Sequence, residues 1–174
     1  QTSLSNTNSI VHCGPMLMNA GRIEGGNAKF RFYAEGMPQS VCRVMEAADH
    51  ERVAVGAALG LKLASTYETI KAQYGVDGVD LHEVIHANPT FGAIDAPVTL
   101  EHRFLTEDTP FSMVPLAALG KLAGVPTPVT DALVCLLGVA TGHDFHGTGP
   151  GLEKMGLSGM SIGEIRRFVD GDGR

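Results

Sequence analysis

Apolar residues recur at intervals of three or four along much of this chain, which is the spacing of one face of an α-helix. Residues 38–61 show the pattern most clearly. Their apolar positions are Val41, Val44, Met45, Ala48, Val53, Ala57 and Leu61. Pro38 suits the first turn of a helix, because its fixed φ is helical and its missing donor is not needed there. The pattern predicts one long amphipathic helix across this stretch.

The same spacing predicts further helices on either side. Residues 3–22 are expected to be helical, with an interruption or kink at Gly14-Pro15 because proline lacks a donor and clashes with the preceding turn. Shorter helices are expected at 66–74, 80–87, 114–123, 130–141 and 162–169. The rest is expected to be a weakly alternating extended stretch at 30–34, an irregular segment at 90–109, a glycine-rich loop at 143–151 and a frayed tail at 170–174. The predicted fold class is therefore all-α, a compact domain of about six to eight packed helices.

Composition narrows the class of protein. The chain has 174 residues, of which 44% are hydrophobic, enough for one domain spanning 1–174 with a real core. The net charge of −6 and the lack of a Lys/Arg cluster argue against nucleic acid and membrane as partners. Cys13, Cys42 and Cys135 are odd in number and widely spaced, which favours a reducing, cytoplasmic setting. The apolar runs are too short to span a bilayer, and no signal peptide is recognisable.

A candidate acid/base site lies near the N-terminus. Asn8, His12 and Asn19 share one face of the predicted helix. An imidazole in apolar surroundings needs a partner for its second nitrogen, and a carboxylate from elsewhere in the fold can supply one. Asparagine is unfavourable inside helices, so these amides are expected to have hydrogen-bonding tasks. The simpler alternative is a core or surface histidine whose ring N–H donates to a backbone carbonyl.

A second polar cluster runs from Arg103 to Asp108. The planar guanidinium of Arg103 could hold a substrate carboxylate with two parallel hydrogen bonds, or could simply be solvated. Asp108 could pair with the imidazole of His12. Its simpler role is to cap the helix or turn that starts at Thr109-Pro110.

These segments carry a family resemblance. Five stretches contribute to it: 6–19, Tyr33-Ala34-Glu35-Gly36, Asn88-Pro89, 103–115 and 152–159. Together and in this order they resemble the C-terminal domain of the opine dehydrogenases, the octopine/nopaline dehydrogenase family. The resemblance covers nearly the whole chain. It implies an all-α domain of the 6-phosphogluconate dehydrogenase C-terminal type.

The resemblance implies an activity and a site. Such enzymes condense a 2-oxo acid, often pyruvate, with the amine of an amino acid and reduce the imine with NADH or NADPH. The family's catalytic pair falls on His12 and Asp108, and its carboxylate-binding arginine on Arg103. Asn8 and Asn19 are further substrate-binding candidates, and no metal is expected. One departure is that Cys13 follows the histidine, where many relatives have proline.

The resemblance also implies an N-terminal Rossmann domain that binds the NAD or NADP. That domain is expected to lie outside this chain, which begins with Gln and is interpreted as part of a longer protein. The segment Gly147-Thr148-Gly149-Pro150-Gly151 lacks the spacing of a dinucleotide loop. The expected partners are the two substrates and that domain, and a homodimer is possible.

Two other functions remain open at this point. His82-Glu83-Val84-Ile85-His86 matches the H-E-x-x-H zinc-protease motif and would place two imidazoles on one helical face. Pro89 follows closely, however, and no third ligand stands at the usual spacing. The other alternative is a non-catalytic helical dimerisation module, in which His12, Arg103 and Asp108 would lie far apart.

Overall fold

The computed structural model describes residues 2–26 and 29–170, and the predicted tail beyond 170 lies outside this part. The described residues are helical and contain no strand longer than a single bridge. The helices are α1 (Thr2–Ser5), α2 (Asn8–Met18), α3 (Ala20–Glu24), α4 (Gln39–Ala58), α5 (Thr66–Tyr74), α6 (Leu81–Ala87), α7 (Pro89–Gly92), α8 (Arg103–Thr106), the π-helix η1 (Thr109–Met113), α9 (Val114–Ala123), α10 (Pro128–Thr141), α11 (Phe145–Thr148) and α12 (Ile162–Asp170). Seven of these have seven or more residues, which confirms the predicted all-α class and range.

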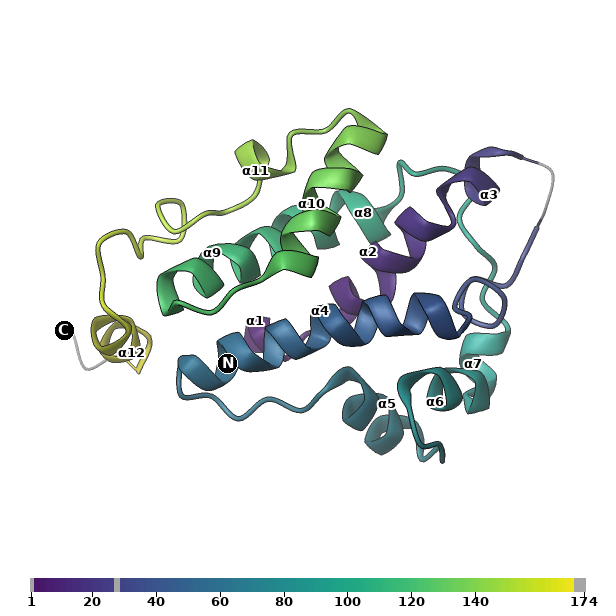
Figure 1. Cartoon of the computed structure of the whole chain (residues 1–174), viewed down its shortest axis with the longest axis horizontal. Helices are drawn as coiled ribbons and strands as arrows, with labels where there is room; N and C mark the ends of the chain where they lie inside the picture. Colours follow the sequence, from purple (N-terminus) through teal and green to yellow (C-terminus); the bar gives the residue numbers. More distant parts are fainter. Residues whose placement is uncertain (1, 27–28, 171–174) are drawn as a thin grey trace.

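The long helix α4 is the centre of the domain. Figure 1 shows it running along the molecule, with α9 and α10 on one side and α5, α6 and α7 on the other. It packs against α2, α6, α9 and α10. Val41, Met45 and Ala48 are buried as predicted, because their spacing places them on one helical face. No helix in the described ranges has the length and apolar character needed to cross a membrane.

The buried face of α4 holds an ion pair that the apolar pattern did not predict. Asp49 and Arg52 are 3% and 2% exposed, whereas the predicted core position Ala57 faces solvent. The guanidinium of Arg52 donates to Asp49 Oδ1 at 2.8 Å, to the carbonyl of Leu4 at 2.6 Å and to that of Ala64 at 2.7 Å. Asp49 also accepts from the backbone N–H and hydroxyl of Thr66. This network joins α1, α4 and the start of α5, and each charge is paired and hydrogen-bonded as burial requires.

Several boundary predictions were wrong. The helix at 3–22 does not break at Gly14-Pro15, because α2 continues to Met18 and the breaks fall before Asn8 and at Asn19. Pro15 lacks only its own N–H, and its carbonyl still accepts from the backbone of Asn19 at 3.0 Å. The segment expected to be irregular contains α7 and α8, and the expected glycine-rich loop at 143–151 contains α11. These helices have four residues each, too few to show a periodic pattern.

The stretch predicted to be extended at 30–34 is extended only as far as Arg31, because residues 32–36 form a turn. Arg31 and Asp95 form an isolated antiparallel bridge, flanked by bonds from Phe32 N–H to the carbonyl of Ile94 and from Ala96 N–H to that of Phe30. The chain then turns at Gly36, where a Cβ would lie 2.4 Å from the carbonyl oxygen of Phe32, so only glycine fits. This turn sets the position of the aromatic side chains beside α2.

Candidate active site

His12 and Asp108 meet in space. His12 lies in the buried part of α2, and its Nδ1 is 2.7 Å from Oδ2 of Asp108. Their side chains are 10% and 15% exposed, so the contact is largely shielded from water. An ionised carboxylate only accepts hydrogen bonds, so Nδ1 carries the hydrogen and neutral His12 has its lone pair on Nε2. This is the arrangement that orients an imidazole for acid/base chemistry.

The other ring nitrogen of His12 contacts a residue that sequence reasoning did not propose for the site. Nε2 lies 3.0 Å from the hydroxyl of Tyr33, which is buried in the turn after residue 31. Burial raises the pKa of Tyr33 to about 12, and nearby Tyr74 and Asp108 add to the shift. The motif at 33–36 belonged to the family resemblance, but only the fold shows that its tyrosine reaches the histidine.

Aromatic rings enclose the imidazole. Phe104 stacks on His12 with 3.7 Å between the ring centroids and 10° between the planes. His102 meets the edge of Phe104 at 4.4 Å, and its Nδ1 accepts from the backbone N–H of Phe104. Partial burial lowers the pKa of His102, and the neighbouring charges of His12 and Arg103 lower it further. The site therefore favours a neutral His102 beside His12.

The carboxylate of Asp108 is positioned by its place in the chain. Asp108 directly precedes the π-helix η1 and makes no capping hydrogen bond, so the alternative role as a helix cap does not apply. Cys13 Sγ lies 3.5 Å from the hydroxyl of Thr109 and 3.7 Å from the carbonyl of Phe104, which fixes α2 against α8 and η1. Burial raises the pKa of Cys13 to about 12, so this thiol stays protonated. Short π-helical segments are frequent at functional sites.

The remaining predicted site residues lie in different settings. Arg103, adjacent to Phe104 in α8, is 68% exposed, and its Nε is 3.6 Å from Glu107. Asn8 is exposed at the start of α2. Asn19 is half-buried, and its amide donates to the carbonyls of Pro15 at 2.9 Å and Gly36 at 2.7 Å. The bond to Gly36 fixes the turn that carries Tyr33.

The histidine pair of the zinc motif is not supported as a metal site. His82 and His86 lie on one face of α6 with ring centroids 4.1 Å apart. However, Nδ1 of His86 contacts the carbonyl of His82 at 2.8 Å and its Nε2 contacts that of Ala34 at 2.9 Å. Within residues 2–26 and 29–170, no three His, Cys, Asp or Glu side chains gather as a metal would require. His86 instead connects α6 to the residue after Tyr33.

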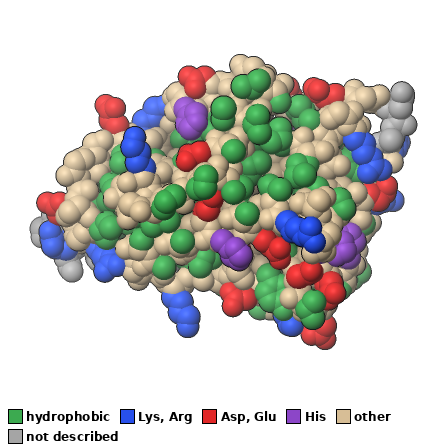
Figure 2. Space-filling view, viewed as in Figure 1, with side chains coloured by type: hydrophobic (Ala, Val, Ile, Leu, Met, Phe, Trp, Pro, Cys, Tyr) green, Lys and Arg blue, Asp and Glu red, His purple; other side chains and the backbone are tan. Residues whose placement is uncertain are grey.

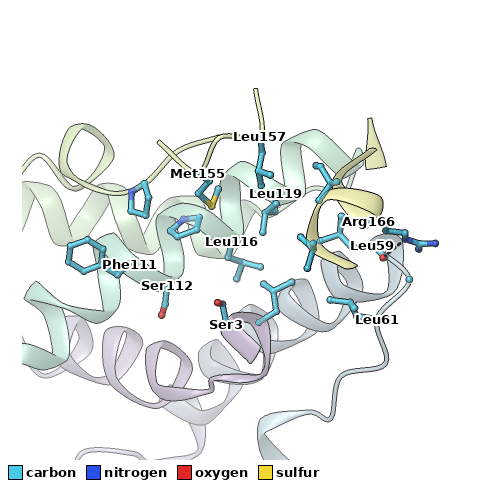
Figure 3. Close-up of a pocket in the computed structure, with 16 residues that line it drawn as sticks. Ser3, Leu59, Leu61, Phe111, Ser112, Leu116, Leu119, Met155, Leu157 and Arg166 are labelled. Carbon is cyan, nitrogen blue, oxygen red and sulfur yellow. Dashed lines mark hydrogen bonds between the residues drawn. The ribbon is translucent and has the colours of Figure 1, made fainter. Parts of the chain in front are cut away.

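An apolar hollow lies elsewhere on the domain. Its volume is about 570 Å³. Figure 3 shows Leu116 and Leu119 of α9 pointing into it opposite Leu59, with Arg166 of α12 at its edge. Arg166 donates from Nε to the carbonyl of Leu59 at 2.8 Å. None of the predicted site residues lines this hollow, so it is separate from the His12 site.

Comparison with known proteins identifies the protein family to which the chain belongs. The family model described as the NAD/NADP octopine/nopaline dehydrogenase alpha-helical domain matches residues 1–141. The chain belongs to this family. An opine dehydrogenase of Arthrobacter sp. (strain 1C) is 38% identical over 169 residues, and a D-nopaline dehydrogenase of Agrobacterium tumefaciens (strain T37) is 30% identical over 189. These matches cover 97% and 95% of this chain but only 47% and 43% of the relatives, so the chain spans about half their length.

Solved structures show the same fold. Octopine dehydrogenase with NADH and L-arginine aligns with a TM-score of 0.74 at 21% identity, covering 91% of this chain and 46% of the other. The same enzyme with NADH and pyruvate gives a TM-score of 0.70. The resemblance found in the sequence is thus confirmed for the family and for the fold.

Proposed function

We propose that this chain is the substrate-binding and catalytic domain of an NAD(P)-dependent, opine dehydrogenase-like oxidoreductase. The reaction joins the amine of an amino acid to a 2-oxo acid such as pyruvate and reduces the condensation product. The single observation that carries the proposal is the 2.7 Å contact between His12 Nδ1 and Asp108 Oδ2. The relatives' names, and the complexes of octopine dehydrogenase with L-arginine and pyruvate, support this substrate class.

The cofactor is assigned to a domain outside this chain. The described residues contain no strand–helix–strand unit, and glycine-rich 147–151 follows helices rather than a strand, so they do not fit a dinucleotide. We propose that an N-terminal Rossmann domain, in the half of the relatives that this chain does not span, holds NAD or NADP. When bound, the nicotinamide would supply the hydride.

The roles of the chain's own residues follow from their chemistry. Asp108 holds the Nδ1 hydrogen of His12 and stabilises the imidazolium, so His12 can take up and return a proton while substrates condense. Arg103 would bind the carboxylate of the oxo acid, since its guanidinium is exposed and its contact with Glu107 is long. Asn8 and Asn19 remain candidates for substrate contacts, Asn19 only through its amide oxygen because its N–H groups are engaged. The buried free thiols of Cys13 and Cys42 support a reducing, cytoplasmic setting.

The test is reconstitution of the intact enzyme. This chain would be joined to the remaining half of the Arthrobacter relative, and oxidation of NADH and NADPH followed with pyruvate and a panel of amino acids. We expect cofactor oxidation that requires both substrates, with the condensed secondary amine identified by mass spectrometry. His12→Ala should lose about 10²–10⁴-fold in kcat, whereas exposed His146→Ala should not. Near-normal turnover of His12→Ala would contradict the proposal.

A further inference from the structure

Both ring nitrogens of His12 already have partners within the chain. Nδ1 is bonded to Asp108 at 2.7 Å and Nε2 to the Tyr33 hydroxyl at 3.0 Å. With the hydrogen on Nδ1, the lone pair of Nε2 accepts the hydroxyl hydrogen of Tyr33. One face of the ring is covered by Phe104. A substrate atom therefore finds no vacant nitrogen on His12.

Tyr33 is held in place by its surroundings. It is 5% exposed, stacks on Phe91 with centroids 4.4 Å apart, and meets Phe32 edge to face at 5.2 Å. Its turn is closed by the bond from Gly36 N–H to the carbonyl of Phe32 and anchored by Asn19. Swinging the phenol away from His12 would break these contacts, so displacement by substrate is unfavourable.

The hydroxyl of Tyr33 also has suitable chemistry. With its pKa raised to about 12, the phenol is neutral near neutral pH. A neutral hydroxyl both donates and accepts, so it can take one proton while giving up its own. When His12 becomes an imidazolium, Nε2–H donates to the Tyr33 oxygen, and the hydroxyl hydrogen must turn to another acceptor. The substrate is the acceptor that the proposed reaction provides.

We infer that Tyr33 is a catalytic residue, and that its hydroxyl carries every proton exchanged between His12 and the substrates; this rests on the proposed function. The substrate ammonium gives a proton to the Tyr33 oxygen while Tyr33 gives its own to His12 Nε2. This frees the amine electron pair, which forms the C–N bond to the oxo-acid carbonyl carbon while the C=O π pair moves onto the oxygen. One proton then passes within this adduct from the nitrogen to the alkoxide, which gives the neutral carbinolamine. The imidazolium then returns its proton through Tyr33 to the carbinolamine hydroxyl. The C–O bond breaks, water leaves, and the nitrogen pair forms the C=N bond of the iminium.

The first experiment removes the hydroxyl and keeps the ring. In the reconstituted enzyme, Tyr33→Phe should lower kcat by about 10²–10⁴-fold while KM for both substrates changes little. Tyr67→Phe is the control and should keep wild-type kcat, because the Tyr67 hydroxyl donates to the carbonyl of Gly78 and does not contact His12. Thermal unfolding of both variants checks that the fold persists. Tyr33→Phe with wild-type kcat would overturn the inference.

The second experiment keeps the hydroxyl and changes its acidity. Trifluorotyrosine at position 33 preserves the ring and its hydrogen bond, so it serves even where Tyr33→Phe misfolds. If the Tyr33 hydroxyl relays protons between the substrates and His12, kcat and its pH profile should change, because the fluorinated phenol is then the proton donor. An unchanged profile would overturn the relay. His12→Ala distinguishes failure of the Tyr33 relay from failure of the proposed function. If His12→Ala is inactive while Tyr33→Phe is fully active, the relay is wrong and the proposed role of His12 and Asp108 is kept.

Discussion

At the residue scale, the site is defined by what each polar atom of His12 touches. A carboxylate fixes one nitrogen, a phenol the other, and a phenyl ring covers one face. The histidine and the aspartate were predictable from the sequence because the family motifs mark them. Tyr33 and Phe104 were not, since apolar spacing gives no sign that an aromatic residue contacts a histidine far away in the chain.

Replacing Asp108 tests the pairing directly. In the reconstituted enzyme, Asp108→Asn keeps the size of the side chain but removes the charge that stabilises the imidazolium. We expect kcat to fall by about 10²–10⁴-fold, measured by NAD(P)H oxidation. Asp77→Asn is the control, because Asp77 is fully exposed and only loosely paired with Lys71. Equal rates for the two variants would show that Asp108 has no part in proton transfer.

His102 predicts a pH dependence of stability. Its pKa is lowered in the folded state from an ordinary 6.5, chiefly by burial, so the unfolded chain binds this proton more readily. The neutral form of His102 is the form that the folded state favours, so its stabilising effect is fully present above pH 6.5 and is lost as the pH falls below that value. Urea unfolding at a series of pH values should therefore show a shallower acid decline in His102→Gln than in wild type. Exposed His146→Gln should leave the slope unchanged. A slope in His102→Gln matching wild type would contradict the assignment.

At the scale of elements, helix ends were less predictable than helix faces. Ser65 and Glu68 form a capping box at the start of α5, and Asp80 caps α6, each within three residues along the chain. The N-terminus of α10 is satisfied from a distance instead. Glu51 of α4 accepts from the backbone N–H of Val129 at 2.7 Å and of Thr130 at 2.8 Å. Such a cap joins two helices that local sequence cannot relate.

Glu51→Gln should loosen that connection. The amide loses the charge that suits a helix N-terminus and presents N–H groups where acceptors are needed. We expect a loss of about 1–2 kcal/mol in the free energy of unfolding by urea denaturation. Glu153→Gln, at an exposed loop position, is the matched control. If both variants unfold at the same urea concentration, Glu51 does not cap α10.

At the scale of the whole molecule, the fold class followed from periodicity, but the arrangement of its centre did not. The spacing of apolar residues places Asp49 and Arg52 on the surface of α4, whereas in the structure both are buried and hydrogen-bonded to each other. Arg52 also donates to the backbone carbonyls of Leu4 and Ala64. Every residue has a carbonyl, so no pattern of side chains could predict these two partners. The outer face of α10 is also apolar, because Leu136 and Val139 are exposed to solvent (Figure 2). A pattern that places every apolar residue inside would not predict this face.

Breaking the central ion pair should affect the entire domain. Asp49→Ala leaves the Arg52 guanidinium buried without its carboxylate and leaves Thr66 without an acceptor. We expect a loss of about 3–5 kcal/mol in the free energy of unfolding, measured by urea denaturation. Asp77→Ala removes a carboxylate from the surface and should cost far less. A loss for Asp49→Ala no larger than for that control would show that the pair is dispensable.

The separation of His12 and Asp108 by 96 positions has a consequence for biosynthesis. A ribosome releases α2 before it has translated α8 and η1, and a domain generally folds as a unit. During that interval the nascent protein holds an imidazole without its carboxylate. The pair of His12 and Asp108 therefore forms only after residue 108 has been translated, and any product truncated before that residue lacks it.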